Sequence, residues 1–163
     1  MSNEMDIVLT VNGEEYPVRV EPRRTLADTL RDQCGLTGTN SGCEHGICGS
    51  CTVLVDDEPV RACLMFAVQA QGRKIRTVEG LANGDDLHPL QRAFIEHHAL
   101  QCGFCTPGCL MLAVGILERV PDMSDAALRE ALSANLCRCT GYKNILKAVR
   151  AAASEVRARS AAR

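Results

Sequence analysis

Aromatic side chains are scarce in this chain: they make up 3% of its 163 residues, and tryptophan is absent. The core must therefore be built from aliphatic residues and cysteine. A core of that kind gives domains of roughly 80 residues only marginal stability, and a bound metal would strengthen them. An excess of positive charge is also missing, since the formal net charge is −2. The composition therefore gives no sign of nucleic-acid binding.

Long hydrophobic runs are missing as well. The longest wholly apolar run, residues 109–114, is far shorter than the roughly 20 residues that a membrane-spanning helix needs. The first residues are acidic and lead directly into an alternating strand pattern, without the basic and apolar regions of an export signal. We therefore expect no membrane span and a cytoplasmic, reducing location in which thiols remain available to metal.

Cysteine, in contrast, is abundant, and eight of the ten cysteines form two groups of four. The first group has the order Cys-x4-Cys-x2-Cys with a fourth cysteine farther along: Cys43, Cys48, Cys51 and Cys63. The second group joins a Cys-x2-Cys pair to a distant Cys-x-Cys pair: Cys102, Cys105, Cys137 and Cys139. Because an iron–sulfur cluster commonly takes four thiolates, the pattern predicts two clusters and therefore an electron relay.

The first group has the spacing of plant-type two-iron clusters. It lies on a glycine-rich stretch, residues 38–49, whose backbone can approach a cluster closely and aim N–H groups at its sulfurs. A zinc site and inert cysteines are the alternatives. A Rieske centre fits poorly, because no Cys-x2-His pair complements Cys43 and His45. We expect His45 to lie at the edge of the site and not to be a ligand.

The second group, taken alone, is more ambiguous, because a Cys-x2-Cys pair and a distant Cys-x-Cys pair could also hold zinc. Both pairs fall at junctions between predicted helices, where a bundle could bring them together. Cys109 lies one helical turn beyond Cys105 and could face the same site. We expect Cys109 and Cys34 to be small buried hydrophobes outside the ligand sets.

Five alternating stretches in the first half of the chain predict strands. They cover residues 6–11, 16–20, 52–55, 60–64 and 74–78. Asn12-Gly13 separates the first pair and Asp56-Asp57 the second pair, and both dipeptides are turn signals.

One helix is expected between the two hairpins. It would begin after the N-cap Thr25, continue to Gln33, and end at Gly35. Five strands around one helix predict a small α+β domain that spans residues 1–79.

The second half has helical periodicity, and four helices with short links predict a bundle over residues 80–163. The first helix would begin at Pro89, and the second would have Thr106 as N-cap and Pro107 as its first residue. The third would begin at Ser124 or Asp125, and the fourth at Tyr142 or Lys143. The end of the chain, from about residue 154, is expected to fray.

The histidines of the second half have no spacing typical of metal ligands. They are His88, His97 and His98. We expect them on helix surfaces that face solvent or a partner.

Three sequence stretches together resemble the small iron–sulfur subunit of the molybdenum hydroxylases, the xanthine oxidase family. They are Gly-Cys-Glu-His-Gly-Ile-Cys-Gly-Ser-Cys-Thr-Val from residue 42, Gln-Cys-Gly-Phe-Cys-Thr-Pro-Gly from residue 101, and Asn-Leu-Cys-Arg-Cys-Thr-Gly-Tyr from residue 135. The stretches occur in the family's order, and the resemblance covers nearly the whole chain. It is strongest to the separate small subunits of three-subunit enzymes such as aerobic carbon monoxide dehydrogenase.

The resemblance implies the fold and the site residues. The first domain would be a plant-ferredoxin-like β-grasp with a [2Fe–2S] cluster on Cys43, Cys48, Cys51 and Cys63. The second would be a four-helix bundle with a [2Fe–2S] cluster on Cys102, Cys105, Cys137 and Cys139. Gln101 matches a glutamine that hydrogen-bonds a molybdenum pterin, and Cys139 matches the ligand between cluster and pterin. Cys109 is a departure, because relatives commonly have Met or another apolar residue there.

The resemblance also implies partners. A large subunit would carry the molybdenum pterin, often as the cytosine dinucleotide, and a medium subunit would carry FAD, in a dimer of heterotrimers. The chain would pass single electrons from molybdenum through both clusters to the flavin, and it would carry out no bond chemistry itself. Two alternatives remain at this stage: a stand-alone two-cluster electron carrier and a zinc-stabilised interaction module.

Overall fold

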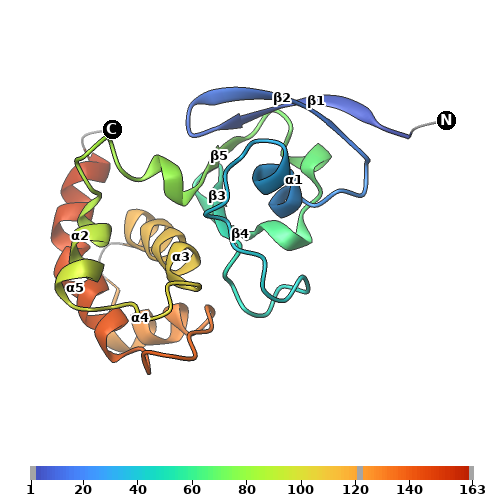
Figure 1. Cartoon of the computed structure of the whole chain (residues 1–163). Coiled ribbons are helices and arrows are strands. Elements are labelled where there is room, and N and C mark those ends of the chain that lie inside the picture. Colours follow the sequence, from blue (N-terminus) through green and yellow to red (C-terminus); the bar gives the residue numbers. More distant parts are fainter. Residues whose placement is uncertain (1–2, 121–122, 162–163) are drawn as a thin grey trace.

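The computed structural model describes residues 3–120 and 123–161, which form a sheet half and a helical half side by side (Figure 1). The strands are β1 Met5–Val11, β2 Glu14–Val20, β3 Thr52–Val55, β4 Glu58–Arg61 and β5 Lys74–Arg76. The α-helices are α1 Leu26–Asp32, α2 Pro89–Glu96, α3 Thr106–Arg119, α4 Asp125–Leu132 and α5 Lys143–Ala161. The short 3-10 helices are η1 Ala62–Leu64, η2 Ala67–Ala70 and η3 Val78–Gly80. The predicted α+β class is confirmed.

The strands form one mixed sheet in the order β2-β1-β5-β3-β4. β1 and β5 are parallel, and the other neighbouring strands are antiparallel. Both predicted hairpins are present, and their turns use left-handed backbone conformations, with φ of 53° at Asn12 and 87° at Gly13. Such turns match the twist of the strands they join, which explains the Asn-Gly signal.

Helix α1 lies beside the sheet and begins as predicted. The Thr25 hydroxyl accepts a hydrogen bond from the Asp28 N–H, and four of the helix's residues are buried. The helix ends at Asp32, and Gly35 turns the chain with φ of 71°. Sheet and helix together give the β-grasp arrangement that the family resemblance implied.

Two predicted strands end earlier than expected. The strand predicted to reach residue 64 stops at Arg61, because η1 turns the chain so that Cys63 faces Cys51. The strand predicted to reach residue 78 stops at Arg76, because the Asn12 amide forms hydrogen bonds of 2.9 Å to both the backbone N–H and the hydroxyl of Thr77. In both places side-chain contacts from elsewhere in the fold override an alternating pattern.

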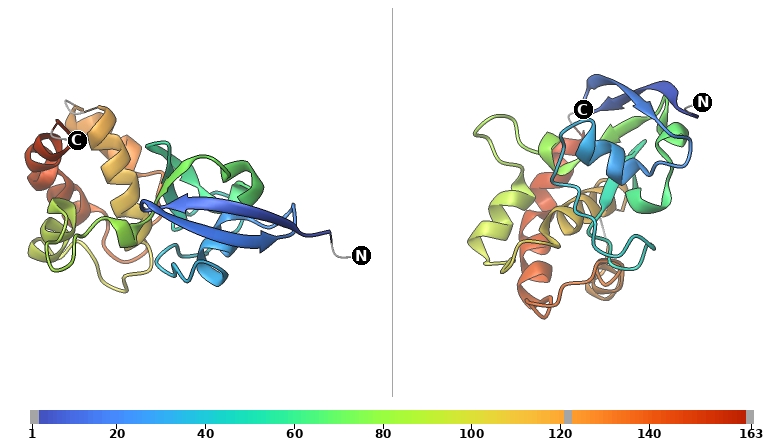
Figure 2. Two further views of the ribbon diagram at one scale, coloured as in Figure 1. Left: turned by 90° about the horizontal axis from the view of Figure 1, so that it is seen from above. Right: turned by 45° about the vertical axis from the view of Figure 1, so that its right-hand side comes forward.

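The helical half packs α2 and α3 against α5, and α4 closes one end (Figure 1; Figure 2). Helix α3 is buried along most of its length, as its apolar sequence predicted. Its first residue is Thr106 and its N-cap is Cys105, one residue earlier than predicted. Helix α5 continues through Ala161, and the last two residues of the end predicted to fray, 162 and 163, lie outside the described residues. None of the helices in the described ranges is long and apolar enough to cross a membrane.

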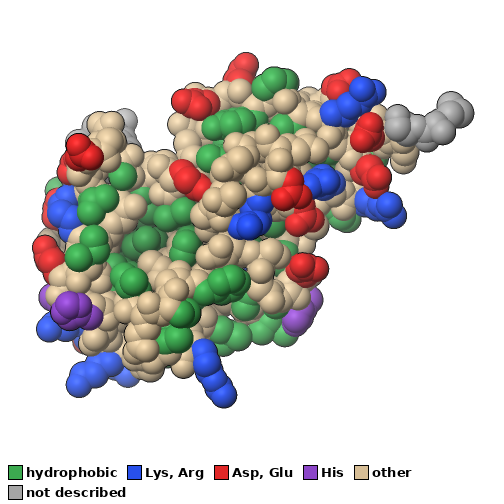
Figure 3. Space-filling model, in the orientation of Figure 1, with side chains coloured by type: hydrophobic (Ala, Val, Ile, Leu, Met, Phe, Trp, Pro, Cys, Tyr) green, Lys and Arg blue, Asp and Glu red, His purple; other side chains and the backbone are tan. Residues whose placement is uncertain are grey.

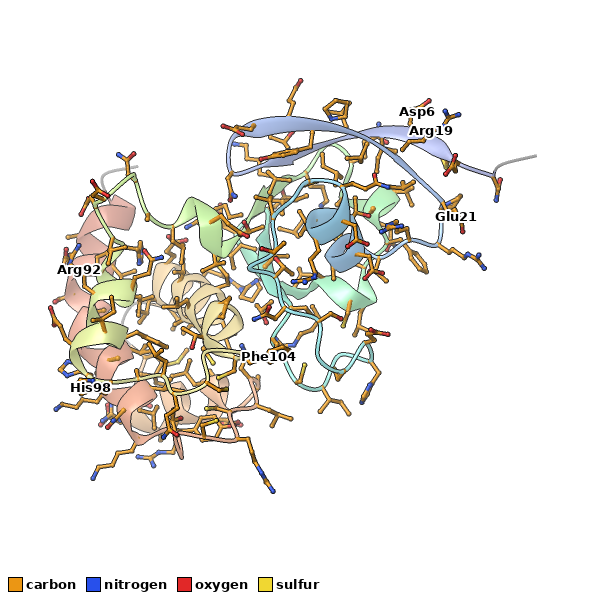
Figure 4. The ribbon with its side chains drawn as sticks, in the orientation of Figure 1. Asp6, Arg19, Glu21, Arg92, His98 and Phe104 are labelled. Atoms are coloured by element: carbon orange, nitrogen blue, oxygen red, sulfur yellow. The ribbon has the colours of Figure 1, made fainter. Side chains whose placement is uncertain are left out.

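The histidine prediction is wrong for His88. This residue is 3% exposed, and its ring accepts a hydrogen bond from the Leu90 N–H, which caps α2. The Gln91 side chain in turn accepts from the His88 N–H, completing a reciprocal cap. His98 lies exposed at the end of α2, on the outer side of the helical half (Figure 4).

The two halves are packed directly on each other through α3 and β3. The side chain of Leu54, on β3, belongs to the helical core. Gly115 leaves space on α3 for Leu54 and Pro59, which a Cβ at that position would displace. Arg76 also makes a two-pronged ion pair with Glu118 at 2.8 and 3.1 Å. This interface determines where the two cysteine groups lie relative to each other.

Candidate iron–sulfur centres

The N-terminal cysteine set comprises Cys43, Cys48, Cys51 and Cys63. Three of these lie on the loop before β3, and Cys63 lies on η1. The loop doubles back through left-handed conformations at Glu44, Gly46 and Gly49, with φ of 55°, 85° and 75°. Glycine adopts such φ values without steric cost, so the sequence favours this curled loop.

Backbone N–H groups of the loop point at the thiols of this set. The Cys48 N–H donates to Cys43 Sγ at 3.4 Å, and the Gly46 N–H donates to Cys63. The backbone donors, chiefly Cys48 and then His45, lower the pKa of the Cys43 thiol to about 6. Burial, together with the neighbouring Cys51 thiol, raises the pKa of Cys63 to about 11. Donors aimed at sulfur are what a buried, negatively charged cluster requires.

The C-terminal cysteine set comprises Cys102, Cys105, Cys137 and Cys139. The first two precede α3 and the last two lie between α4 and α5. The fold brings these distant pairs together: the sulfurs of Cys102 and Cys139 are 3.5 Å apart, and the thiols of Cys105 and Cys137 are hydrogen-bonded. The contact with Cys102 raises the pKa of Cys139.

Side chains, more than glycine turns, hold the loop that carries Cys137. The Tyr142 hydroxyl accepts from the Cys137 N–H at 2.8 Å and donates to the Asn135 carbonyl at 3.1 Å. The Thr140 hydroxyl lies 3.1 Å from Cys137 Sγ. Sequence reasoning treated Tyr142 only as a helix start and missed this role. The available signal was its place in the third family-like stretch.

Cys109 is buried, as predicted, with 2% of its surface exposed. It is not isolated, however, because its thiol hydrogen-bonds to Cys105. That contact is the largest cause of the raised pKa of Cys105. Cys34 is only half-buried, and it packs against the core of the sheet half.

Gln101 lies at the surface beside the C-terminal set. Its amide donates a 3.1 Å hydrogen bond to the carbonyl of Cys139, so both residues proposed to meet a pterin are adjacent and exposed. The two sets are also linked directly, because the Leu136 N–H donates to the Cys48 carbonyl at 2.8 Å. One backbone hydrogen bond therefore connects the residue before Cys137 to a cysteine of the other set.

The thiols of both sets fit two-iron clusters. Within the described residues, no three His, Cys, Asp or Glu side chains converge to hold a single metal ion. Within each set the thiols contact one another in pairs, with Cys109 as an additional neighbour of Cys105, and a [2Fe–2S] cluster takes two terminal ligands on each of its irons. The fold and the paired thiols define a protein of the two-cluster [2Fe–2S] class.

Comparison with known proteins agrees with the assignment to the two-cluster [2Fe–2S] class. Residues 9–79 match the family described as "2Fe-2S iron-sulfur cluster binding domain", and residues 77–150 match "[2Fe-2S] binding domain". The gamma subunit of caffeine dehydrogenase from Pseudomonas sp. is 55% identical over 88% of this chain and 88% of its own length. The nicotine 6-hydroxylase small subunit of Paenarthrobacter nicotinovorans is 55% identical over 91% of this chain and 89% of its own.

A solved structure has the same fold as this chain. A chain of quinoline 2-oxidoreductase from Pseudomonas putida 86 superimposes with a TM-score of 0.92 and 53% identity, covering 96% of this chain and 98% of that one. The chain belongs to the family of small iron–sulfur subunits of the molybdenum hydroxylases. It is an electron-transfer component of a multisubunit oxidoreductase, which confirms the predicted function.

Proposed function

We propose that the eight cysteines of the two sets are the cluster ligands, with two thiolates on each iron. In the N-terminal set the pairs would be Cys43 with Cys48 and Cys51 with Cys63. In the C-terminal set they would be Cys102 with Cys139 and Cys105 with Cys137. The observation that carries the proposal is that the fold brings the two distant pairs of the C-terminal set together, with the sulfurs of Cys102 and Cys139 3.5 Å apart, as a two-iron cluster requires.

Bound clusters supply the ability to take up and release single electrons. The residues of this chain hold the two sets apart and link them. The hydrogen bond from Leu136 to the Cys48 carbonyl, one residue from Cys137, supports a relay between the sets. Two cysteine sets whose loops are joined by a backbone hydrogen bond suit electron transfer better than two independent structural metal sites.

The C-terminal set would face the large, molybdenum-binding subunit. Cys102 and Cys139 are exposed, and so are three large apolar side chains within three residues of them in sequence: Leu100, Phe104 and Leu136. Phe104 lies where the helical half meets the 42–51 loop, on a side where hydrophobic side chains gather (Figure 3; Figure 4). Exposed apolar groups around a redox site favour a partner that covers them. Gln101 would then orient the pterin, in the cytosine dinucleotide form.

The N-terminal set would face a medium subunit that carries FAD. Three large apolar side chains are exposed near this set: Ile47, Leu64 and Phe66. A Cβ on Gly46 would overlap Leu64, which places that side chain against the cluster loop. Two apolar faces, one at each set, suit a chain that lies between two partners.

We propose a dimer of such heterotrimers in the cytoplasm, where the ten cysteines, all described and all free, would stay reduced.

The domain division would lie between residues 79 and 80. Two core clusters support it, one around the sheet and α1 and one around α2–α5. Leu54 is shared across the division, since it lies on β3 and packs in the helical core. The division therefore separates two cores that meet through one tight interface.

For the whole enzyme, we propose hydroxylation of an N-heterocyclic compound. Relatives at 53–55% identity are named for caffeine, nicotine and 6-hydroxypseudooxynicotine. Relatives named as aldehyde oxidoreductases are 42–44% identical. Assays of the assembled enzyme with quinoline or nicotinate against benzaldehyde would test this choice, and exclusive oxidation of the aldehyde would contradict it.

The central test is the composition of the chain purified anaerobically with its co-expressed partners. We expect about four irons and four acid-labile sulfides per chain, and co-purification of two larger subunits. Zinc in place of iron would refute the ligand proposal. A partner-free chain that carries both clusters and serves as a complete carrier would favour the stand-alone alternative.

A further inference from the structure

Arg61 connects the sheet half to the loop that carries the C-terminal set. It is the last residue of β4 and is half-buried. One guanidinium nitrogen donates to the hydroxyl of Thr52, on β3, and the other donates to the Ala134 carbonyl at 2.7 Å. A planar guanidinium can bridge two acceptors at a fixed angle, which a lysine ammonium cannot reproduce.

The acceptors of Arg61 are themselves tied to the two cysteine sets. Thr52 is buried next to Cys51, and its hydroxyl donates to the Gly49 carbonyl at 2.6 Å. Ala134 begins the three-residue segment that ends at Leu136, whose N–H donates to the Cys48 carbonyl. Two hydrogen bonds therefore hold the 134–136 segment: Arg61 donates to the Ala134 carbonyl at one end, and the Leu136 N–H donates to the Cys48 carbonyl at the other.

The middle residue of this segment leaves little room for movement. Asn135 is 1% exposed and lies against Gly49, where a Cβ would overlap its amide oxygen. A Cβ on Gly108, at the start of α3, would likewise overlap the Gly49 carbonyl. Close packing of this kind resists small displacements, so the segment has one position relative to the N-terminal loop.

We propose that Arg61 is a positioning residue that holds the two clusters at one fixed separation and orientation by bridging Thr52 and Ala134. The inference rests on the proposed ligand sets. The guanidinium donates to Thr52 and Ala134, and neither of these residues belongs to the cysteine sets. Its loss would leave each group of four thiols intact and would loosen only the geometry between the groups.

Another arginine at the same interface, Arg119, provides a matched control. Arg119, the last residue of α3, pairs with Glu58, the first residue of β4. Glu58 and Arg61 lie at opposite ends of β4, so the Arg119 pair lies at the end of the strand away from the cysteine sets. Replacement of Arg119 removes an arginine from the interface without touching the 134–136 segment.

The test is electron paramagnetic resonance of the holoenzyme with both clusters reduced by dithionite. Each reduced cluster carries one unpaired spin, and the coupling between the spins falls with the cube of their separation. We expect a resolved splitting in the unmodified chain and after Arg119→Gln. Loss of the resolved splitting is expected after Arg61→Gln and after Arg61→Lys, with iron content and the spectrum of each singly reduced cluster unchanged.

Each other outcome overturns the inference in a distinguishable way. Splitting retained after Arg61→Gln would show that the bridge does not fix the geometry. A resolved splitting that is retained after Arg61→Lys but lost after Arg61→Gln would assign the effect to the positive charge and not to bridging. An unmodified chain with both clusters but no splitting would show that they are not held close together. An unmodified chain without iron would overturn the proposed ligand sets as well.

Discussion

The two cysteine sets have the same composition but are built differently. In the N-terminal set, one curled loop supplies three thiols, and Cys51 and Cys63 are 2% and 8% exposed. In the C-terminal set, two loops that are distant in sequence supply two thiols each, and Cys102 and Cys139 remain exposed. One set is enclosed by its own backbone, and the other has two exposed thiols.

The difference lies in what holds each set together. Backbone N–H groups and left-handed turns organise the N-terminal set, so its geometry is largely local. Packing of α3, α4 and α5 organises the C-terminal set, and Tyr142 and Thr140 complete it. We therefore expect the two sets to respond to different substitutions, and the following experiments test that independence.

The largest effect is expected from Cys48→Ser. A serine hydroxyl is a poor replacement for a thiolate, so the N-terminal cluster should be lost. The C-terminal cluster should remain, because Cys48 contributes only its backbone carbonyl to that side. Cluster-specific paramagnetic resonance signals measure this, with Cys34→Ser as a control outside both sets. Retention of both signals would show the assignment of Cys48 to be wrong.

Tyr142→Phe should weaken the C-terminal cluster alone. The substitution leaves the Cys137 N–H and the Asn135 carbonyl without their shared partner, which costs about 1–3 kcal/mol. The C-terminal cluster should then bleach at a lower urea concentration, while the N-terminal cluster bleaches as before. Tyr16→Phe is the control, since the Tyr16 hydroxyl donates a hydrogen bond to Glu14 on an exposed hairpin. Equal bleaching of both clusters would contradict the independence of the sets.

The thiols of the metal-free chain should differ in reactivity with pH. Because the pKa of Cys43 is lowered to about 6, this residue is mostly thiolate at pH 7 and should react first with iodoacetamide. Its rate should fall as the pH drops through 6. The pKa of Cys63 is raised to about 11, so its rate should keep rising up to that pH. Peptide mass spectrometry follows both residues, and faster modification of Cys63 at pH 7 would contradict the prediction.

The smallest effect is expected from Cys109→Ala. Cys109 contacts Cys105 but lies outside the two proposed ligand sets, so both clusters should remain and stability should fall by on the order of 1 kcal/mol. Iron content and thermal unfolding measure the two effects. Selective loss of the C-terminal cluster would instead make Cys109 a ligand or an essential support.

Much of the fold could be predicted because its signals are local. Asn12-Gly13 sets a hairpin, Thr25 caps a helix, and the two cysteine spacings indicate cluster loops. The errors occurred where distant contacts decide the outcome. β4 stops at Arg61 because Cys63 must face Cys51, and His88 is buried because it caps α2 with help from Gln91. No periodicity in the sequence encodes such contacts.

The sequence by itself indicated a two-iron centre on the first cysteine group, because ligand spacing and glycine turns act over a few residues. For the second group the spacing left zinc open, and the family resemblance supplied the type of cluster. The sequence also determined the fold class, through alternating and helical periodicity. Only the tertiary structure decided which thiols contact one another and which remain exposed. It also decided that Arg61 and Leu136 connect the sheet half to the loop of the C-terminal set, and that Tyr142 holds that loop. These features depend on residues far apart in sequence that meet only when α3 packs against β3.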